Sequence, residues 1–129
     1  MQLQNGMTGR VELTVTTADT ALALGSGLLP VLSTPRLVAL MEQAACAAVE
    51  EVMEPGKTTV GTRIDIRHNA ATPLGMRAWA EAELVAVEDR ALTFRIEAFD
   101  EAGSIAIADH QRFIVDSERF MRKAEAKAK

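Results

Sequence analysis

The chain has 129 residues, of which 48% are hydrophobic and 25% are charged, and its formal net charge is −4. This length and composition indicate one globular domain over 1–129, and the acidic balance, few aromatic side chains and absence of tyrosine disfavour a nucleic-acid partner. A single cysteine excludes an internal disulfide and a multi-cysteine metal site, which fits a reducing compartment.

No part of the sequence resembles a membrane or export signal. No segment approaches the roughly 18 uninterrupted apolar residues of a membrane span. The start, Met1 to Gly6, lacks the basic and apolar regions of a secretory signal. We therefore expect a soluble cytoplasmic protein with no membrane partner.

The first predicted element is a strand over 9–17. Val11, Leu13 and Val15 alternate there with polar residues, which is typical of a half-buried strand. Residues 18–32 are mostly apolar and contain two glycines and a proline. This composition indicates an apolar loop or a broken helical turn, the kind of segment that covers a pocket.

A long helix is predicted over 33–53, and it organises the rest of the chain. The hydroxyl of Ser33 or Thr34 supplies an N-cap, Pro35 suits the first helical position, and Pro55 with the glycine after it ends the helix. Most positions between are apolar or alanine, more than a surface helix with one apolar stripe would show. We therefore expect the helix to be wrapped by other elements.

Four strands are predicted after the helix, separated mostly by short turns. Their ranges are 58–69, 76–88, 92–98 and 104–115. The short links between the late strands indicate an antiparallel meander. The charged, alanine-rich tail over 116–129 is expected to be a frayed or solvent-facing helix at most.

This order of elements predicts an α+β fold in which one antiparallel sheet curls around one long central helix. The many alanines of the helix and of strand 76–88 allow the close approach that such curling needs. A lone sheet leaves its edges exposed, and pairing with a second subunit would cover one of them. The arrangement is that of the hotdog fold.

Glu42 is the strongest local sign of chemistry. Its neighbours one turn away include Val38, Ala39, Ala45 and Cys46, where an unpaired charge is costly. One interpretation is a buried ion pair, for which the candidate partners are Arg63, Arg67 and Arg112. The other is a carboxylate whose pKa is raised by desolvation and which acts as base or nucleophile.

Other residues have a structural and a functional interpretation. Thr34 is a helix cap whose hydroxyl also lies where an anion or a polarised carbonyl is favoured. His68, at the end of the inward face of its strand, is a core or edge histidine or a proton carrier. Gly61 marks a bulge or a backbone N–H that is free to meet a ligand oxygen.

Two further side chains are assigned structural roles. Cys46, among alanines in mid-helix, is expected to be a small core residue. His110 lies in mid-strand with an ambiguous face, and we favour a structural role for it. The two histidines make a poor case for a metal site, and no phosphate-binding glycine signature is present.

Together these residues resemble the fluoroacetyl-CoA thioesterase-like group of hotdog proteins over about Leu29 to Phe120. The segments that carry the resemblance are Ser33-Thr34-Pro35, Leu40-Met41-Glu42, Thr59-Val60-Gly61-Thr62, His68-Asn69-Ala70-Ala71-Thr72-Pro73 and His110-Gln111-Arg112-Phe113. The spacing of Thr34, Glu42, Gly61 and His68 is its most specific feature.

The resemblance implies an acyl-CoA thioesterase. It implies that Thr34, Glu42 and His68 are catalytic, and that Gly61 and Arg112 bind the substrate. It also implies a homodimer with active sites at the subunit interface. No cofactor is expected, because coenzyme A is part of the substrate.

One departure from the group bears on the substrate. Its fluoroacetyl-CoA-specific members carry aromatic residues before the Thr-bearing turn, whereas 18–32 has none. The aliphatic residues there favour a short or medium apolar acyl chain. Two alternatives stay open: a hotdog protein that binds an acyl ligand without catalysis, and a hydratase-type enzyme, whose Asp/His loop is not evident in this sequence.

Overall fold

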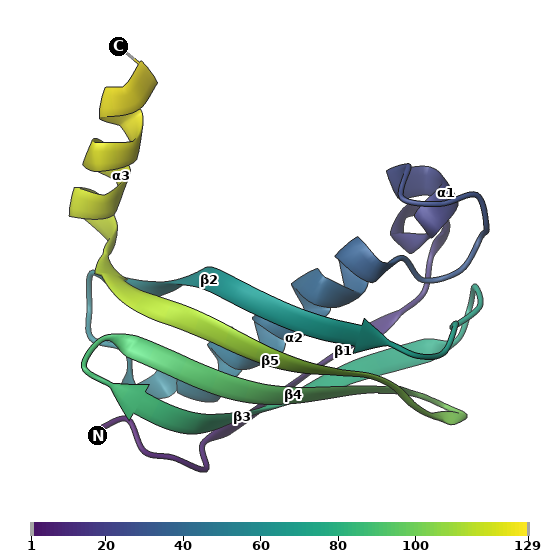
Figure 1. Ribbon diagram of the computed structural model, residues 1–129, viewed down its shortest axis with the longest axis horizontal. Coiled ribbons are helices and arrows are strands. Elements are labelled where there is room, and N and C mark those ends of the chain that lie inside the picture. The colour runs from purple at the N-terminus through teal and green to yellow at the C-terminus, as the bar shows by residue number, and fades with distance from the viewer. Residues whose placement is uncertain (1, 129) are drawn as a thin grey trace.

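The computed structural model describes residues 2–128. It contains every predicted element, with ends that differ by a few residues. In chain order the elements are β1 (Thr8–Thr14), η1 (Thr17–Asp19), α1 (Ala21–Leu24), α2 (Thr34–Val49), η2 (Glu50–Val52), β2 (Lys57–His68), β3 (Arg77–Glu88), β4 (Ala91–Asp100), β5 (Gly103–Asp116), α3 (Ser117–Glu125) and η3 (Ala126–Ala128) (Figure 1).

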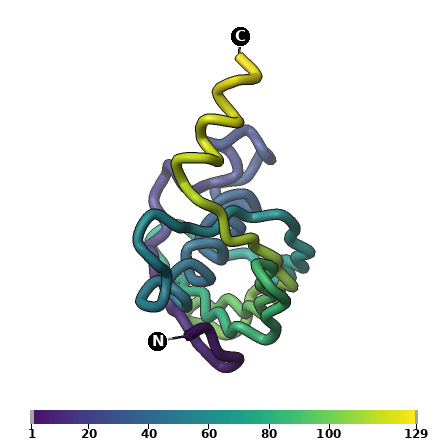
Figure 2. Tube along the Cα trace, turned by 90° about the vertical axis from the view of Figure 1, so that its left-hand side faces the viewer, coloured from purple at the N-terminus to yellow at the C-terminus, as the bar shows by residue number. Residues whose placement is uncertain are grey.

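The five strands form one antiparallel sheet in the order β1-β3-β4-β5-β2. The sheet curves, and α2 lies on its concave side (Figure 2). The helix contacts β1 and β3 most, with fewer contacts to β4 and β2. This is the hotdog arrangement, as predicted, and it leaves β1 and β2 as the two edges of the sheet.

Small residues let the helix lie close to the sheet. The inward side chains of β3 include Ala78, Ala80 and Ala82, all of which are buried. At Gly9 a Cβ atom would overlap the backbone of Ala44 and Ala48 in α2. Gly9 is therefore needed where β1 and α2 come closest.

The start of α2 decides which hydroxyl caps the helix. Ser33 is the N-cap, since its side chain accepts a hydrogen bond from the backbone N–H of Arg36 at 3.1 Å. Thr34 is the first helical residue and Pro35 the second, so Pro35 lies one position later than predicted. The hydroxyl of Thr34 is consequently free for another partner.

A β-bulge in β2 changes which residues face α2. The pairing with β5 shifts between Gly61 and Arg63, leaving Thr62 as the extra residue. Strict alternation predicts Val60 on the inner face and Gly61 on the outer face, and this is wrong. Because the bulge reverses the alternation, Gly61 faces inward with Ile64, Ile66 and His68.

Two segments extend beyond the β2 edge at opposite ends of the molecule (Figure 1). One is the segment over 18–32, which contains α1 and is called the α1 segment below. The other is α3, none of whose residues is buried, as expected for the charged tail. The salt bridge between Arg36 and Asp19, at 3.0 Å, ties the start of the α1 segment to α2. Among residues 2–128, no helix is long and apolar enough to cross a membrane.

Candidate active site

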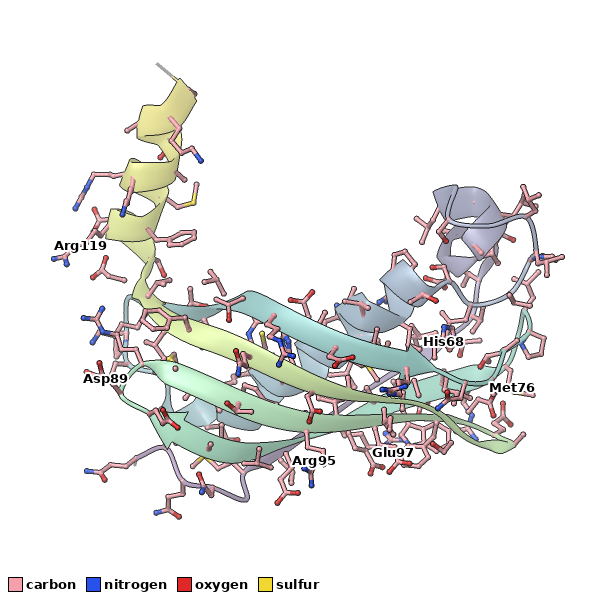
Figure 3. All side chains as sticks on the ribbon, viewed as in Figure 1. His68, Met76, Asp89, Arg95, Glu97 and Arg119 are labelled. Carbon is pink, nitrogen blue, oxygen red and sulfur yellow. The ribbon has the colours of Figure 1, made fainter. Side chains whose placement is uncertain are left out.

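Thr34 and His68 form the first of two polar groups on the inner side of the sheet. The Thr34 hydroxyl oxygen lies 2.8 Å from Nδ1 of His68, a hydrogen bond between the first turn of α2 and the last residue of β2. Figure 3 shows His68 at the end of the molecule that carries α1. The structure thus brings together two of the three predicted catalytic side chains.

The other nitrogen of the His68 ring has no partner in the described part of the chain. Nε2 is buried and makes no hydrogen bond there, and buried polar atoms are normally paired. Burial lowers the pKa of His68, and the backbone of Ala70 opposes this shift. A neutral imidazole with one unused nitrogen is suited to exchanging a proton with a ligand or with a group from a second chain.

Glu42 belongs to a second group, which is built around Arg112. Arg112 donates from Nη1 to Oε2 of Glu42 at 3.0 Å, from Nε to the Thr59 hydroxyl at 2.8 Å, and from Nη2 to the Thr59 carbonyl at 3.0 Å. The Arg112 side chain is only 8% exposed, whereas that of Glu42 is 39% exposed. Glu42 is therefore a held, partly accessible carboxylate with Arg112 as its partner, and not a desolvated one.

Gly61 packs directly against this carboxylate. A Cβ atom at Gly61 would lie 2.5 Å from Oε2 of Glu42 and 3.3 Å from Nη1 of Arg112. Real Cβ contacts are not that short, so only glycine leaves the carboxylate where it is. By turning Gly61 inward, the bulge therefore leaves space for the Glu42 carboxylate.

The two groups are separated within one chain. Thr34 and Glu42 lie eight positions apart on α2, which corresponds to about 12 Å along the helix axis. Gly61 and His68 lie seven positions apart on β2, or roughly 20 Å. One small carbonyl group cannot touch both groups of the same chain.

A surface depression adjoins each group. One of about 280 Å³ lies beside Thr34 and His68 and is also lined by Ala21 and Val31 of the α1 segment. Another, of about 500 Å³, lies beside Glu42 and Arg112 and is also lined by Cys46. Each group is thus accessible to a ligand or to a second chain.

The structure contradicts one single-residue prediction, confirms another and adds two residues to the site. Cys46 is exposed, contrary to its predicted place in the core, because it lies on the face of α2 that the sheet does not cover. Arg112 is confirmed as the ion-pair partner of Glu42. Thr59 and His110 also belong to the Arg112 group, and both face inward. Strict alternation places Thr59 on the outer face because it does not include the bulge. The sequence around His110 does not indicate which face of the sheet this residue occupies.

Comparisons with known proteins agree on one family. The family model described as fluoroacetyl-CoA-specific thioesterase matches residues 15–118. A fluoroacetyl-CoA thioesterase of Streptantibioticus cattleyicolor is 38% identical over 97 residues, which cover 75% of this chain and 70% of the relative.

Solved structures give the same result for the fold. A structure of the fluoroacetyl-CoA thioesterase matches with a TM-score of 0.93 at 31% identity, covering 98% of both chains. A hot-dog-like protein from Thermanaerovibrio acidaminovorans matches with a TM-score of 0.86 at 22% identity, covering 95% of this chain and 91% of the other. The second match concerns the fold alone.

Proposed function

The chain belongs to the fluoroacetyl-CoA-specific thioesterase family, and on that premise we propose that it hydrolyses an acyl-CoA thioester with Thr34, Glu42, Gly61 and His68. The observation that carries the assignment is the pairing of these residues. The Thr34 hydroxyl forms a hydrogen bond with His68, and the Glu42 carboxylate packs against Gly61.

Each residue has a role that its chemistry suits. Glu42, held by Arg112, either adds to the thioester carbonyl to give an anhydride or takes a proton from the attacking water. Both routes place negative charge on the carbonyl oxygen, where a backbone N–H at Gly61 stabilises it. The Thr34–His68 pair orients the carbonyl and gives a proton to the leaving thiolate. In the anhydride route a water molecule then hydrolyses the anhydride and restores the Glu42 carboxylate. Both routes therefore yield a carboxylic acid and coenzyme A.

Such a site needs a second copy of the chain. Because the two groups lie far apart within one protomer, a shared carbonyl must sit between Thr34 and His68 of one protomer and Glu42 and Gly61 of the partner subunit. A two-fold homodimer would contain two such sites. The unpartnered Nε2 of His68 supports this arrangement, since the described chain itself leaves that atom unsatisfied.

The β2 edge offers a surface for this dimer. An antiparallel pairing of two β2 strands centred on Asp65 sets Ile64 of one copy opposite Ile66 of the other. In the same register Arg63 of one copy lies opposite Arg67 of the other. Because Thr62 is the extra, unpaired residue of the bulge, the next pair is Gly61 of one copy with His68 of the other. Pairing of this kind also covers an exposed sheet edge.

The α1 segment supports a short or medium apolar acyl group. Four of its leucines do not pack against the chain's own core: Leu22, Leu24, Leu28 and Leu29 are between 49% and 87% exposed. Other residues of the same segment, Ala21 and Val31, line the Thr34–His68 depression, so these exposed leucines are suited to covering an aliphatic acyl chain that leaves it. No cofactor is required, because coenzyme A arrives with the substrate.

A panel of acyl-CoAs assayed for release of free thiol tests the function. We expect turnover of one or more apolar acyl-CoAs. If none is cleaved but one raises the melting temperature, the protein is a binder. If an enoyl-CoA loses its double-bond absorbance without thiol release, the activity is that of a hydratase.

A further inference from the structure

His110 is a buried residue of β5 that the proposed reaction does not use directly. It is 1% exposed. Its Nδ1 lies 2.8 Å from the Arg63 carbonyl oxygen, and its Nε2 lies 3.2 Å from Nη1 of Arg112. Because a carbonyl oxygen only accepts and a guanidinium only donates, Nδ1 carries the proton and Nε2 is an acceptor.

We propose that His110 is a positioning residue for Glu42: its unprotonated Nε2 accepts one N–H of Arg112 Nη1 and thereby directs the other N–H of that nitrogen at Oε2 of Glu42. The inference rests on the proposed function only in assigning Glu42 to catalysis. The chain of contacts runs from the Arg63 carbonyl through His110 and Arg112 to Glu42.

The guanidinium shows why this contact matters. Thr59 holds Arg112 on the side of Nε and Nη2, through its hydroxyl and its carbonyl oxygen. On the other side, Nη1 has two hydrogens and two partners, His110 and Glu42. Since the Glu42 side chain is 39% exposed and His110 is 1% exposed, His110 is the more constrained partner and fixes the direction of Nη1.

The surroundings of His110 keep its ring in place and neutral. Phe94 of β4 packs beside it, with ring centroids 6.2 Å apart, and a Cβ atom at Gly61 would lie 3.5 Å from its Cε1. Burial lowers the pKa of His110 and the Arg112 charge adds to the shift, while the Arg63 carbonyl and the Glu42 charge oppose it. A protonated ring would present an N–H to Arg112 instead of an acceptor.

A purely structural role makes a different prediction, because His110 also links β5 to β2 through the Arg63 carbonyl. Two substitutions separate the roles. His110→Gln can place an amide oxygen near the position of Nε2, which keeps the acceptor for Arg112. His110→Asn can place an amide N–H near the position of Nδ1, which keeps the donor for Arg63 and loses the acceptor.

The test compares kcat, KM and melting temperature for the parent and both variants. We expect His110→Gln to keep kcat within about threefold of the parent and His110→Asn to lose about 10- to 100-fold, since misplacing a reacting group by about 1 Å costs that much. KM should change little, because His110 does not touch substrate. Equal kcat for the two variants, or a higher kcat for His110→Asn, would overturn the proposal.

A second readout does not depend on turnover. The ¹³C signal of the Glu42 side-chain carboxyl, assigned by its loss in Glu42→Gln, should move in His110→Asn and stay in place in His110→Gln. If this pattern holds but no acyl-CoA is cleaved, the proposed function fails and the positioning role stands. If the signal moves equally in both variants or in neither, the positioning role is wrong.

Discussion

Glu42→Gln is expected to lower kcat for acyl-CoA hydrolysis about a hundred- to ten-thousand-fold, the usual range for loss of a general acid–base group. The amide keeps an oxygen that can accept the N–H of Arg112, so the contact at 3.0 Å can survive. It cannot attack a carbonyl or take a proton from water. The loss should therefore appear in kcat, with little change in melting temperature.

Steady-state kinetics with the best substrate of the panel measures this effect. Glu51→Gln is the matched control, because it makes the same charge change at an exposed position just after the end of α2. We expect the control to stay within about twofold of the parent, as for most surface substitutions. A Glu42→Gln enzyme as fast as its control would show that Glu42 is not catalytic.

Gly61→Ala is expected to cost about a hundredfold in kcat while the fold persists. The added methyl group would meet Oε2 of Glu42, which is the free end of a flexible side chain and can move away. Once moved, the carboxylate no longer lies between Arg112 and the reacting carbonyl, and a displacement of about 1 Å is enough for a loss of this size. Melting temperature should fall little, because no backbone atom lies in the way.

The double variant Gly61→Ala with Glu42→Gln checks this mechanism. If Gly61 acts through the position of Glu42, the second substitution adds little to the loss that Glu42→Gln already causes. If the fold-losses in kcat of the two single variants multiply in the double variant, this account is contradicted. Gly61 would then have an effect of its own, independent of Glu42. A large fall in the melting temperature of Gly61→Ala would also contradict it.

The sequence predicted the framework of the fold because its local signals agree. Alternation in the strands, the capped alanine-rich helix and the short turns all favour one sheet around one helix. Of the two interpretations of Glu42, the ion pair with an arginine is confirmed, although the Glu42 side chain is partly exposed and not buried; a carboxylate on a largely apolar helix needs such a partner. Arg112 could not be singled out from Arg63 and Arg67, since the choice depends on strand pairing.

The details that strict periodicity missed lie at the site. The bulge at Thr62 reverses the alternation in β2 and turns Gly61 inward, which no two-residue pattern can express. The choice of Ser33 as the N-cap frees the Thr34 hydroxyl for His68. Spacing along the chain could not show which residues of α2 meet which residues of β2, namely that Thr34 contacts His68 and that Glu42 lies against Gly61.

A mixed-dimer experiment tests most directly whether the site is shared between two protomers. One chain carries Thr34→Ala and His68→Ala, the other carries Glu42→Gln, and each alone should be nearly inactive. After unfolding and refolding together in equal amounts, about half of the dimers are mixed, and each mixed dimer has one intact site of its two. The account predicts recovery of about a quarter of the parent activity, from that symmetry argument. If the mixture stays as inactive as its components although mixed dimers form, the site lies within one protomer and the account is wrong.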